Sequence, residues 1–172
     1  MTPAKLGPIR QIAYVVPDVD AAACLWIRQF GAGPFFKVEA VRLPGWTYLG
    51  HPQDMAIDLM MGQLGDVMIE LLRPHTLEPS VYSHAIAAGP VLHHYGLLVD
   101  DLQEATRLVA APPLTTGTSM GGTPFSYNDT RSTLGVLVEL IEARSDVRAI
   151  FDFIAGASRG WDGRDPLRAL SL

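Results

Sequence analysis

Four polar residues at spaced positions could together bind a divalent metal ion. Gln11 and His94 each begin a short apolar run, while Glu70 and Glu139 each lie in the middle of another. Two carboxylates, one amide oxygen and one imidazole nitrogen suit Zn²⁺, Ni²⁺, Co²⁺, Mn²⁺ or Fe²⁺, with water filling the remaining positions. A carboxylate among apolar neighbours is costly without a partner. We therefore predict that the four side chains converge on one ion.

The four positions match in pairs because the sequence contains the same pattern of residues twice. Residues 11–18 and 94–101 both have a polar first residue, an apolar run and an acidic turn, and alignment of the two places Gln11 on His94. Residues 67–72 and 136–141 are both apolar with one central glutamate. This internal repeat indicates two copies of one structural unit.

Hydrophobic periodicity predicts the same order of elements in both copies. The first copy has strands at 9–16, 35–43, 55–62 and 67–72 with a helix at 19–30, and the second has strands at 94–99, 114–118, 125–129 and 134–141 with a helix at 102–110. We expect 46–54 to be a loop, 81–88 a short helix, and a last helix to run from Ser145 or Asp146 through Ala157. The prediction is an α+β fold with two tandem βαβββ modules that form a cupped, barrel-like mixed β-sheet shell with helices outside. The modules are 9–72 and 92–142, the linker is 73–91, and a C-terminal helix and tail occupy 143–172.

Composition limits the classes of protein to consider. The 172 residues are 48% hydrophobic, enough for a sizeable core, and no apolar run reaches the roughly 18 residues of a membrane helix. The net charge is -5, with 13 basic and 18 acidic residues and no basic cluster, so we expect neither nucleic acid nor a membrane as partner. The single Cys24, which we place in the core, and the lack of an apolar signal segment favour the cytoplasm.

The doubled βαβββ unit and the four polar positions resemble the vicinal oxygen chelate superfamily. This superfamily includes glyoxalase I, methylmalonyl-CoA epimerase, extradiol dioxygenases, and bleomycin- and fosfomycin-resistance proteins. The resemblance covers residues 9–142 and is carried by 11–18, 67–74, 92–101 and 134–141. It implies that Gln11, Glu70, His94 and Glu139 are the metal ligands. Many members have His where this chain has Gln11, but zinc-type glyoxalase I has the set Gln, Glu, His, Glu.

The resemblance implies a glyoxalase-like, metal-dependent epimerase, isomerase or lyase that acts through a metal-stabilised enolate. Glu139 or Glu70 would be the catalytic base, on a small, fairly apolar, oxygen-bearing substrate. One alternative is a metal-free binding or drug-sequestering protein of the bleomycin-resistance type. Another is an Fe²⁺ extradiol dioxygenase. Gln11 weakens this alternative, because the ligand set of those enzymes resembles two histidines and one carboxylate, and the set here has one histidine.

The remaining predictions concern the surroundings of the site. Apolar and aromatic side chains are expected to contact the substrate, namely Phe35, Tyr48, Met60, Phe125 and Tyr127. Strand alternation places His93 on the face opposite His94, which suggests a structural role. Trp161 is expected to pack onto the body of the protein, or alternatively to close over a ligand. The two modules could pair within one chain or across a homodimer.

Overall fold

The computed structural model describes residues 6–75 and 79–170, and their helices and strands follow the predicted repeat. The first part of the chain forms β1 (Gln11–Val15), α1 (Val19–Phe30), β2 (Phe35–Val41), β3 (Thr47–Tyr48), β4 (His51–Pro52), β5 (Ile57–Leu64), β6 (Val67–Pro74) and α2 (Ser83–Ala88). The second part forms β7 (Val91–Val99), α3 (Leu102–Val109), β8 (Pro113–Thr118), β9 (Pro124–Asn128), α4 (Arg131–Leu134), β10 (Leu137–Glu142), α5 (Ser145–Ser158) and β11 (Leu167–Ala169).

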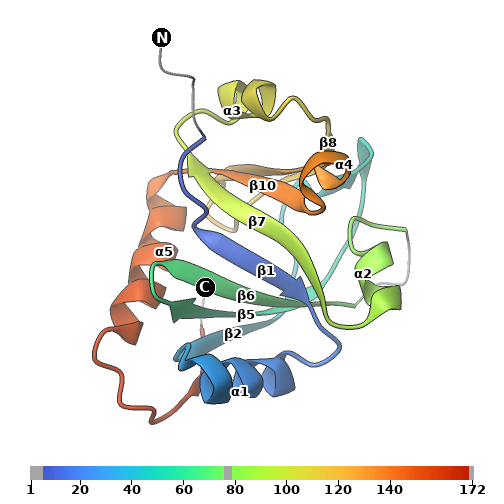
Figure 1. The fold of residues 1–172 in the computed structure, drawn as a ribbon. Helices are drawn as coiled ribbons and strands as arrows, with labels where there is room; N and C mark the ends of the chain where they lie inside the picture. The colour runs from blue at the N-terminus through green and yellow to red at the C-terminus, as the bar shows by residue number, and fades with distance from the viewer. Residues whose placement is uncertain (1–5, 76–78, 171–172) are drawn as a thin grey trace.

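The described strands form one curved, unclosed, mixed sheet in the order β11-β2-β5-β6-β1-β7-β10-β9-β8-β3-β4. In its middle, β1 and β7 run antiparallel, so the two repeats join within this chain (Figure 1). Each of these strands is also parallel to a strand of its own repeat, β1 to β6 and β7 to β10. The predicted α+β fold is confirmed, but the sheet remains open and does not close into a barrel.

The repeated acidic turns are helix N-caps. The Asp18 side chain accepts a hydrogen bond from the Ala21 backbone N–H at 2.9 Å, and Asp101 accepts one from Glu104 at 2.8 Å. Such a cap satisfies one of the unpaired N–H groups of the first helical turn. The caps start α1 and α3 directly after β1 and β7, and the two helices lie on either side of this central strand pair in Figure 1.

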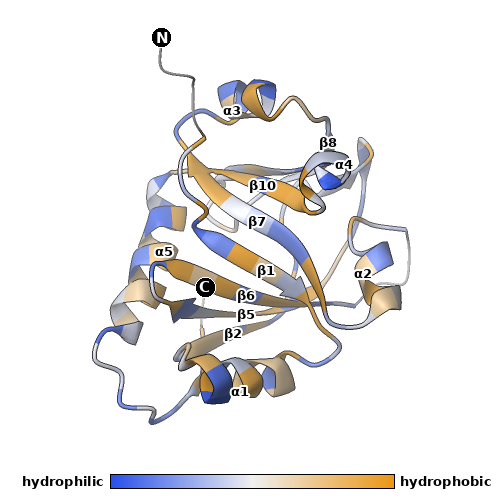
Figure 2. Cartoon of the chain, in the orientation of Figure 1, coloured by the Kyte–Doolittle hydropathy of each residue, from blue (hydrophilic) through white to orange (hydrophobic). Residues whose placement is uncertain are grey.

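Strand alternation divides the apolar residues between two layers. In β10, Val138 and Leu140 pack in the cluster that includes α3, whereas Leu137 and Ile141 belong to the largest core on the other face. In β6, Ile69 similarly packs in the cluster that includes α1. Helix α5 packs against the largest core, which we call the inner core. Figure 2 shows hydrophobic central strands interrupted by hydrophilic segments within β7 and at the start of β1.

Two segments differ from their predicted structures. Residues 46–54, expected to be a loop, contain the short strands β3 and β4, and β3 pairs with β8 of the second repeat. The unpredicted β11 pairs in parallel with β2, and the Phe35 N–H donates to the Pro166 carbonyl at 2.8 Å. These strands have only two or three residues each, too few to show a period of two.

One residue of α1 differs from its predicted place, whereas Trp161 of the tail packs as predicted. Cys24 is exposed, which corrects its assignment to the core, because the inward face of α1 presents Ala23. The Trp161 ring packs against Gly33, where an added Cβ would lie 3.0 Å from the ring. No helix in the described residues has the length and hydrophobicity to cross a membrane.

Candidate functional site

Adjacent rows of paired residues bring the four predicted ligands onto one face of the sheet. Ala13 of β1 is paired with Glu70 of β6 on one side and with His94 of β7 on the other. Directly paired residues point to the same face of a sheet, so Glu70 and His94 project together. The methyl group of Ala13 leaves the space between them open.

The second row contains the other two polar residues. Gly96 of β7 is paired with Gln11 of β1 and with Glu139 of β10. A Cβ added to Gly96 would lie only 2.7 Å from Gln11 Oε1, so the absence of a side chain here makes room for the Gln11 amide. The sheet register therefore gathers Gln11, Glu70, His94 and Glu139 on the inner face.

The imidazole of His94 lies between the two carboxylates. Its Nε2 atom is 3.1 Å from Glu139 Oε2 and 3.5 Å from Glu70 Oε2, and its side chain is 0% exposed. Neither His94 Nε2 nor Gln11 Oε1 has a hydrogen-bond partner with acceptable geometry among the described residues. Two buried polar atoms without such hydrogen-bond partners thus lie on the same face of the sheet.

Burial sets the protonation of the site. Desolvation raises the pKa of Glu139 to about 8, against a hydrogen bond from Tyr127 that lowers it. Burial and then repulsion by Glu139 raise the pKa of Glu70 well above its usual value, although a hydrogen bond from Gln11 opposes them. Burial lowers the pKa of His94 to about 3. Near neutral pH, without an ion, the carboxyls therefore hold protons and the imidazole is uncharged.

The prediction that His93 faces away from His94 is wrong. The pairing of β1 with β7 skips one residue, because Ala13 lies opposite His94 and Tyr14 lies opposite Leu92. His93 is thus the extra residue of a β-bulge, which breaks the alternation of side chains along the strand. Its ring lies 4.7 Å from the Tyr82 ring and 5.2 Å from the His94 ring, centroid to centroid.

A cavity of about 130 Å³ adjoins three of the four residues. Gln11, Glu70 and Glu139 line it together with apolar side chains of β5, β6 and β10. Helix α5 contributes Phe151 and two aliphatic residues, so it forms part of the cavity wall. The sequence identified this helix but gave no signal that it would cover the site.

The predicted substrate-binding residues lie in three different places. Phe125 and Tyr127 line the cavity, and Tyr48 packs against the inner core without lining it. Phe35 and Met60 are fully buried in the cluster with α1, on the other face of the sheet. The prediction for these two residues is corrected, because alternation turns their chain neighbours, Phe36 and Met61, toward the inner core instead.

The fit of a metal ion to this site rests on its donor atoms. Within residues 6–75 and 79–170, no group of three or more His, Cys, Asp and Glu side chains is arranged as a ready metal centre. The converging atoms are instead one imidazole nitrogen, one amide oxygen and two carboxyl groups, with the first two unpaired. This set matches the ligand types of a borderline divalent ion, and carboxyl deprotonation would supply the charge.

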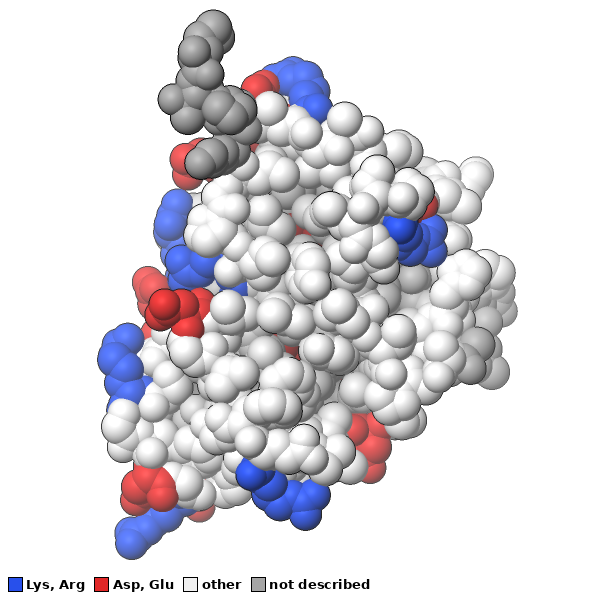
Figure 3. All heavy atoms as spheres, in the orientation of Figure 1, with Lys and Arg blue, Asp and Glu red and all other residues white. Residues whose placement is uncertain are grey.

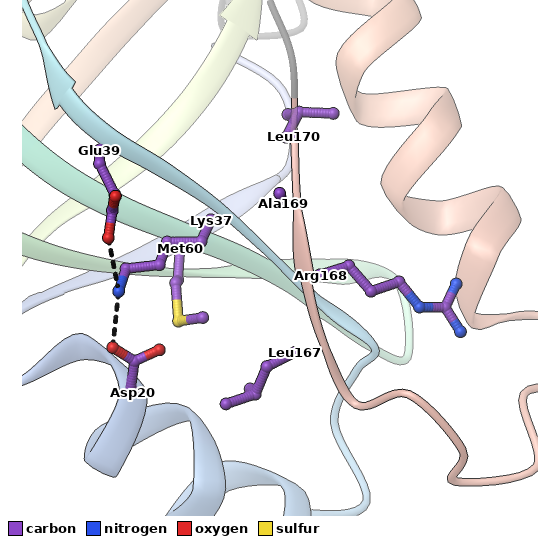
Figure 4. A pocket seen from close by; sticks show the side chains of 8 residues that line it. All are labelled: Asp20, Lys37, Glu39, Met60, Leu167, Arg168, Ala169 and Leu170. Carbon is purple, nitrogen blue, oxygen red and sulfur yellow. Dashed lines mark hydrogen bonds and ion pairs between the residues drawn. The ribbon is translucent and has the colours of Figure 1, made fainter.

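A second cavity, of about 410 Å³, lies between α1, β2 and β11 (Figure 4). Lys37 Nζ reaches Asp20 Oδ2 at 2.6 Å and Glu39 Oε1 at 3.0 Å, so its charge is already balanced. We interpret this cavity as a structural groove.

In the view of Figure 3, Lys and Arg side chains lie around the rim of the face, and its centre carries neither.

Comparison with known families and structures places the chain in a superfamily. Residues 10–113 match the Glyoxalase/Bleomycin resistance protein/Dioxygenase superfamily. The chain belongs to this superfamily, the vicinal oxygen chelate group that its sequence resembles. A search of curated proteins found no match.

Solved structures share the fold at low sequence identity. The methylmalonyl-CoA epimerase of Mycobacterium tuberculosis aligns with a TM-score of 0.54 and 18% identity, over 81% of this chain and 90% of that one. A hypothetical protein from Bacillus halodurans C-125 aligns with a TM-score of 0.59 and 18% identity, over 80% and 95%. A methylmalonyl-CoA epimerase of Streptomyces coelicolor, in complex with 2-nitronate-propionyl-CoA, aligns with a TM-score of 0.55 and 17% identity, over 82% and 97%.

Proposed function

We propose that this protein is a metal-dependent epimerase, isomerase or lyase that removes a proton next to a carbonyl group of a small substrate. The observation that carries the proposal is the convergence of His94 Nε2 and Gln11 Oε1, both buried and unpaired, with Glu70 and Glu139. Membership of the superfamily supports it, and two of the similar structures are epimerases.

Gln11, Glu70, His94 and Glu139 would hold the ion. A divalent ion bound there supplies Lewis acidity toward substrate oxygens, worth several kcal/mol in enzymes that use it. Glu139 is the better candidate for the base, because its pKa of about 8 lies near neutral pH and Tyr127 hydrogen-bonds to it. A carboxylate bound to an ion is a weak base, so Glu139 would accept the substrate proton only when it is not serving as a ligand.

The cavity favours a small and largely apolar substrate. Its volume is about 130 Å³, and a cavity of roughly 150 Å³ accommodates a benzene-sized molecule. Among the described residues, those that line it include neither Lys nor Arg. We therefore propose a short carbonyl compound and do not extend the proposal to a coenzyme A ester. A short oxo or hydroxy acid also fits the volume, but the charge of its carboxylate would have to be balanced by the ion, because the described residues of the cavity wall supply no cation.

Metal binding and proton exchange test this function directly. Purified protein incubated with Zn²⁺, Co²⁺, Ni²⁺, Mn²⁺ or Fe²⁺ is expected to retain close to one equivalent after desalting. In D₂O, the loaded protein is expected to catalyse deuterium exchange at the carbon next to the carbonyl in some members of a panel of small oxo and hydroxy acids. Retention of less than about a tenth of an equivalent of every metal would contradict the proposal.

The second candidate function is binding of an apolar molecule without chemistry. It is favoured by the aliphatic and aromatic wall and by the cover that α5 provides. Under this proposal, the four polar residues form a neutral hydrogen-bonded network. Ligand binding that survives both a chelator and Glu139→Ala would support this function over the enzymatic one.

A further inference from the structure

The imidazoles of His93 and His94 contact each other, and the His93 ring also contacts a backbone carbonyl. His93 Nε2 lies 3.2 Å from the carbonyl oxygen of Val81. His93 Nδ1 lies 2.9 Å from His94 Nδ1. Both rings are buried, His94 completely and His93 to all but 6%. These two short contacts restrict which ring nitrogens carry protons.

The carbonyl oxygen of Val81 can only accept a hydrogen bond, so His93 Nε2 must carry a proton and donate it. A neutral imidazole has one N–H, which leaves His93 Nδ1 as an acceptor. The nitrogen that faces it at 2.9 Å, His94 Nδ1, must then be the donor. A neutral His94 with its proton on Nδ1 has a free lone pair on Nε2.

The reverse arrangement is disfavoured by the surroundings. A proton on His94 Nε2 would require His93 either to carry two protons or to turn a lone pair toward the carbonyl of Val81. A doubly protonated His93 would be a buried charge with no carboxylate partner beside it among the described residues, which is costly. In the Nδ1–H form, the Nε2 lone pair of His94 faces Glu139 Oε2 at 3.1 Å and Glu70 Oε2 at 3.5 Å.

We propose that His93 is a positioning residue: by accepting the Nδ1 proton of His94, it fixes the tautomer in which His94 Nε2 presents its lone pair to Glu70 and Glu139. Metal-binding histidines are generally held by such a hydrogen bond from the other ring nitrogen, usually to a carboxylate, a carbonyl or water. In this chain a second histidine takes that place, because the bulge turns it to the same side as His94. The role of the lone pair as a metal ligand rests on the proposed function, but the tautomer does not.

The tautomer can be measured in the native, metal-free protein. Two-bond ¹H–¹⁵N correlation spectra of ¹⁵N-labelled protein distinguish protonated from unprotonated ring nitrogens, and His93→Asn identifies which signals belong to His93. We expect His94 to be protonated at Nδ1 and His93 at Nε2. A spectrum with His94 protonated at Nε2 would overturn the inference, whatever the metal affinity.

Two variants test the consequence for metal binding, with Co²⁺ alone as the probe. His93→Phe keeps an aromatic ring beside Tyr82 but removes the acceptor, and it is expected to weaken Co²⁺ binding by about 10–100-fold. His93→Asn places an amide oxygen near the position of Nδ1 and is expected to lose less than about tenfold. His51→Phe, at an exposed histidine of β4, serves as the matched control and should bind Co²⁺ as the native protein does.

The outcomes separate this inference from the proposed function. If the native protein binds Co²⁺ and His93→Phe binds it equally well, the positioning role is refuted and the proposed function stands. If the native protein binds no divalent ion, the proposed function fails, while the spectrum still decides the tautomer. If His93→Phe does not fold, the native spectrum and the affinity of His93→Asn decide the question.

Discussion

The two halves of the site occupy equivalent places in the repeat but differ in their chemistry. The first half presents Gln11 and Glu70 from β1 and β6, which pair in regular register. The second half presents His94 and Glu139 from β7 and β10. Strand β7 carries a bulge at His93, which has no paired residue in β1. Aromatic rings lie against this second half, with the Tyr127 ring 4.8 Å from the His94 ring, centroid to centroid.

This difference shows how a duplicated scaffold supports an asymmetric site. The common register fixes where the four side chains point, while local changes decide what each can do. The amide of Gln11 offers an uncharged oxygen as a possible metal ligand and makes a hydrogen bond to Glu70. In the second half, His93 contacts His94, and Tyr127 hydrogen-bonds to Glu139 and contacts the Tyr82 hydroxyl. We therefore expect substitutions in the two halves to have unequal effects.

The largest expected effect comes from the comparison of the two glutamates. Glu139→Gln removes the proposed base and should lower proton-exchange activity by roughly 10²–10⁴-fold while the protein stays folded. Glu70→Gln should reduce activity mainly through weaker metal binding, so excess metal should restore part of it. Measurement of exchange rates against metal concentration distinguishes the two variants. Equal and metal-reversible losses in both would show that Glu139 is only a ligand.

The next effect concerns the imidazole. His94→Ala removes the only nitrogen ligand of the proposed set, and metal affinity should fall by more than about 100-fold, beyond the range for a residue that only positions a ligand. Isothermal titration with Co²⁺ measures the loss. A smaller loss than that of His93→Phe would reverse the assignment of the two histidines.

The pH dependence of stability tests the buried carboxyls in the ion-free protein. Between pH 6.5 and 8, unfolded glutamates are ionised, whereas the folded Glu139, with its pKa of about 8, and Glu70, whose pKa is also raised, still hold protons. The folded state therefore binds more protons, and the free energy of unfolding should fall as the pH rises through this window. Below it, the lowered pKa values of His93 and His94 act in the opposite direction.

Urea unfolding at pH 6.5 and pH 8, in the presence of a chelator, measures this dependence. Glu139→Gln should show a clearly smaller fall in stability than the native protein, because its amide does not titrate. An unchanged fall in the variant would mean that Glu139 does not hold a proton in the folded state.

A smaller effect is expected from Gly96, which lies between the halves. Gly96→Ala would press a Cβ against Gln11 at 2.7 Å and displace the amide, so metal affinity should fall by up to about tenfold. Gly62→Ala, which would meet Phe35 at 2.8 Å on the other face, is a control with similar crowding. It should cost stability, about 1–3 kcal/mol, without a change in metal affinity.

The smallest effect is expected from Gln11→His, which makes the two halves more alike. Imidazole is as suitable a ligand as the amide, so metal affinity should stay within about tenfold of the native value. Co²⁺ titration and the absorption spectrum of the bound ion would report this change. Complete loss of binding would show that the first half depends on the hydrogen bond between Gln11 and Glu70.

Local sequence patterns predict the helix N-termini and the faces of the two strands that carry the glutamates. The apolar runs and acidic turns repeat in the sequence, and the turns are the N-caps of α1 and α3. Alternation along β6 and β10 places Glu70 and Glu139 on the inner face, as expected for strands with a period of two. Residue type alone could not place Phe35 and Met60, because β2 and β5 carry apolar residues on both faces and their neighbours Phe36 and Met61 are the ones that face inward.

The sequence by itself thus determined the duplicated α+β fold and the positions of four polar residues, because these depend on periodicity and on short-range hydrogen bonds. Only the tertiary structure decided the rest. The bulge that turns His93 beside His94 arises from pairing between strands 80 residues apart in the chain, and α5 covers the cavity because its apolar side chains meet the inner core. Such contacts depend on surfaces that form only when the sheet is assembled, and no local pattern records them.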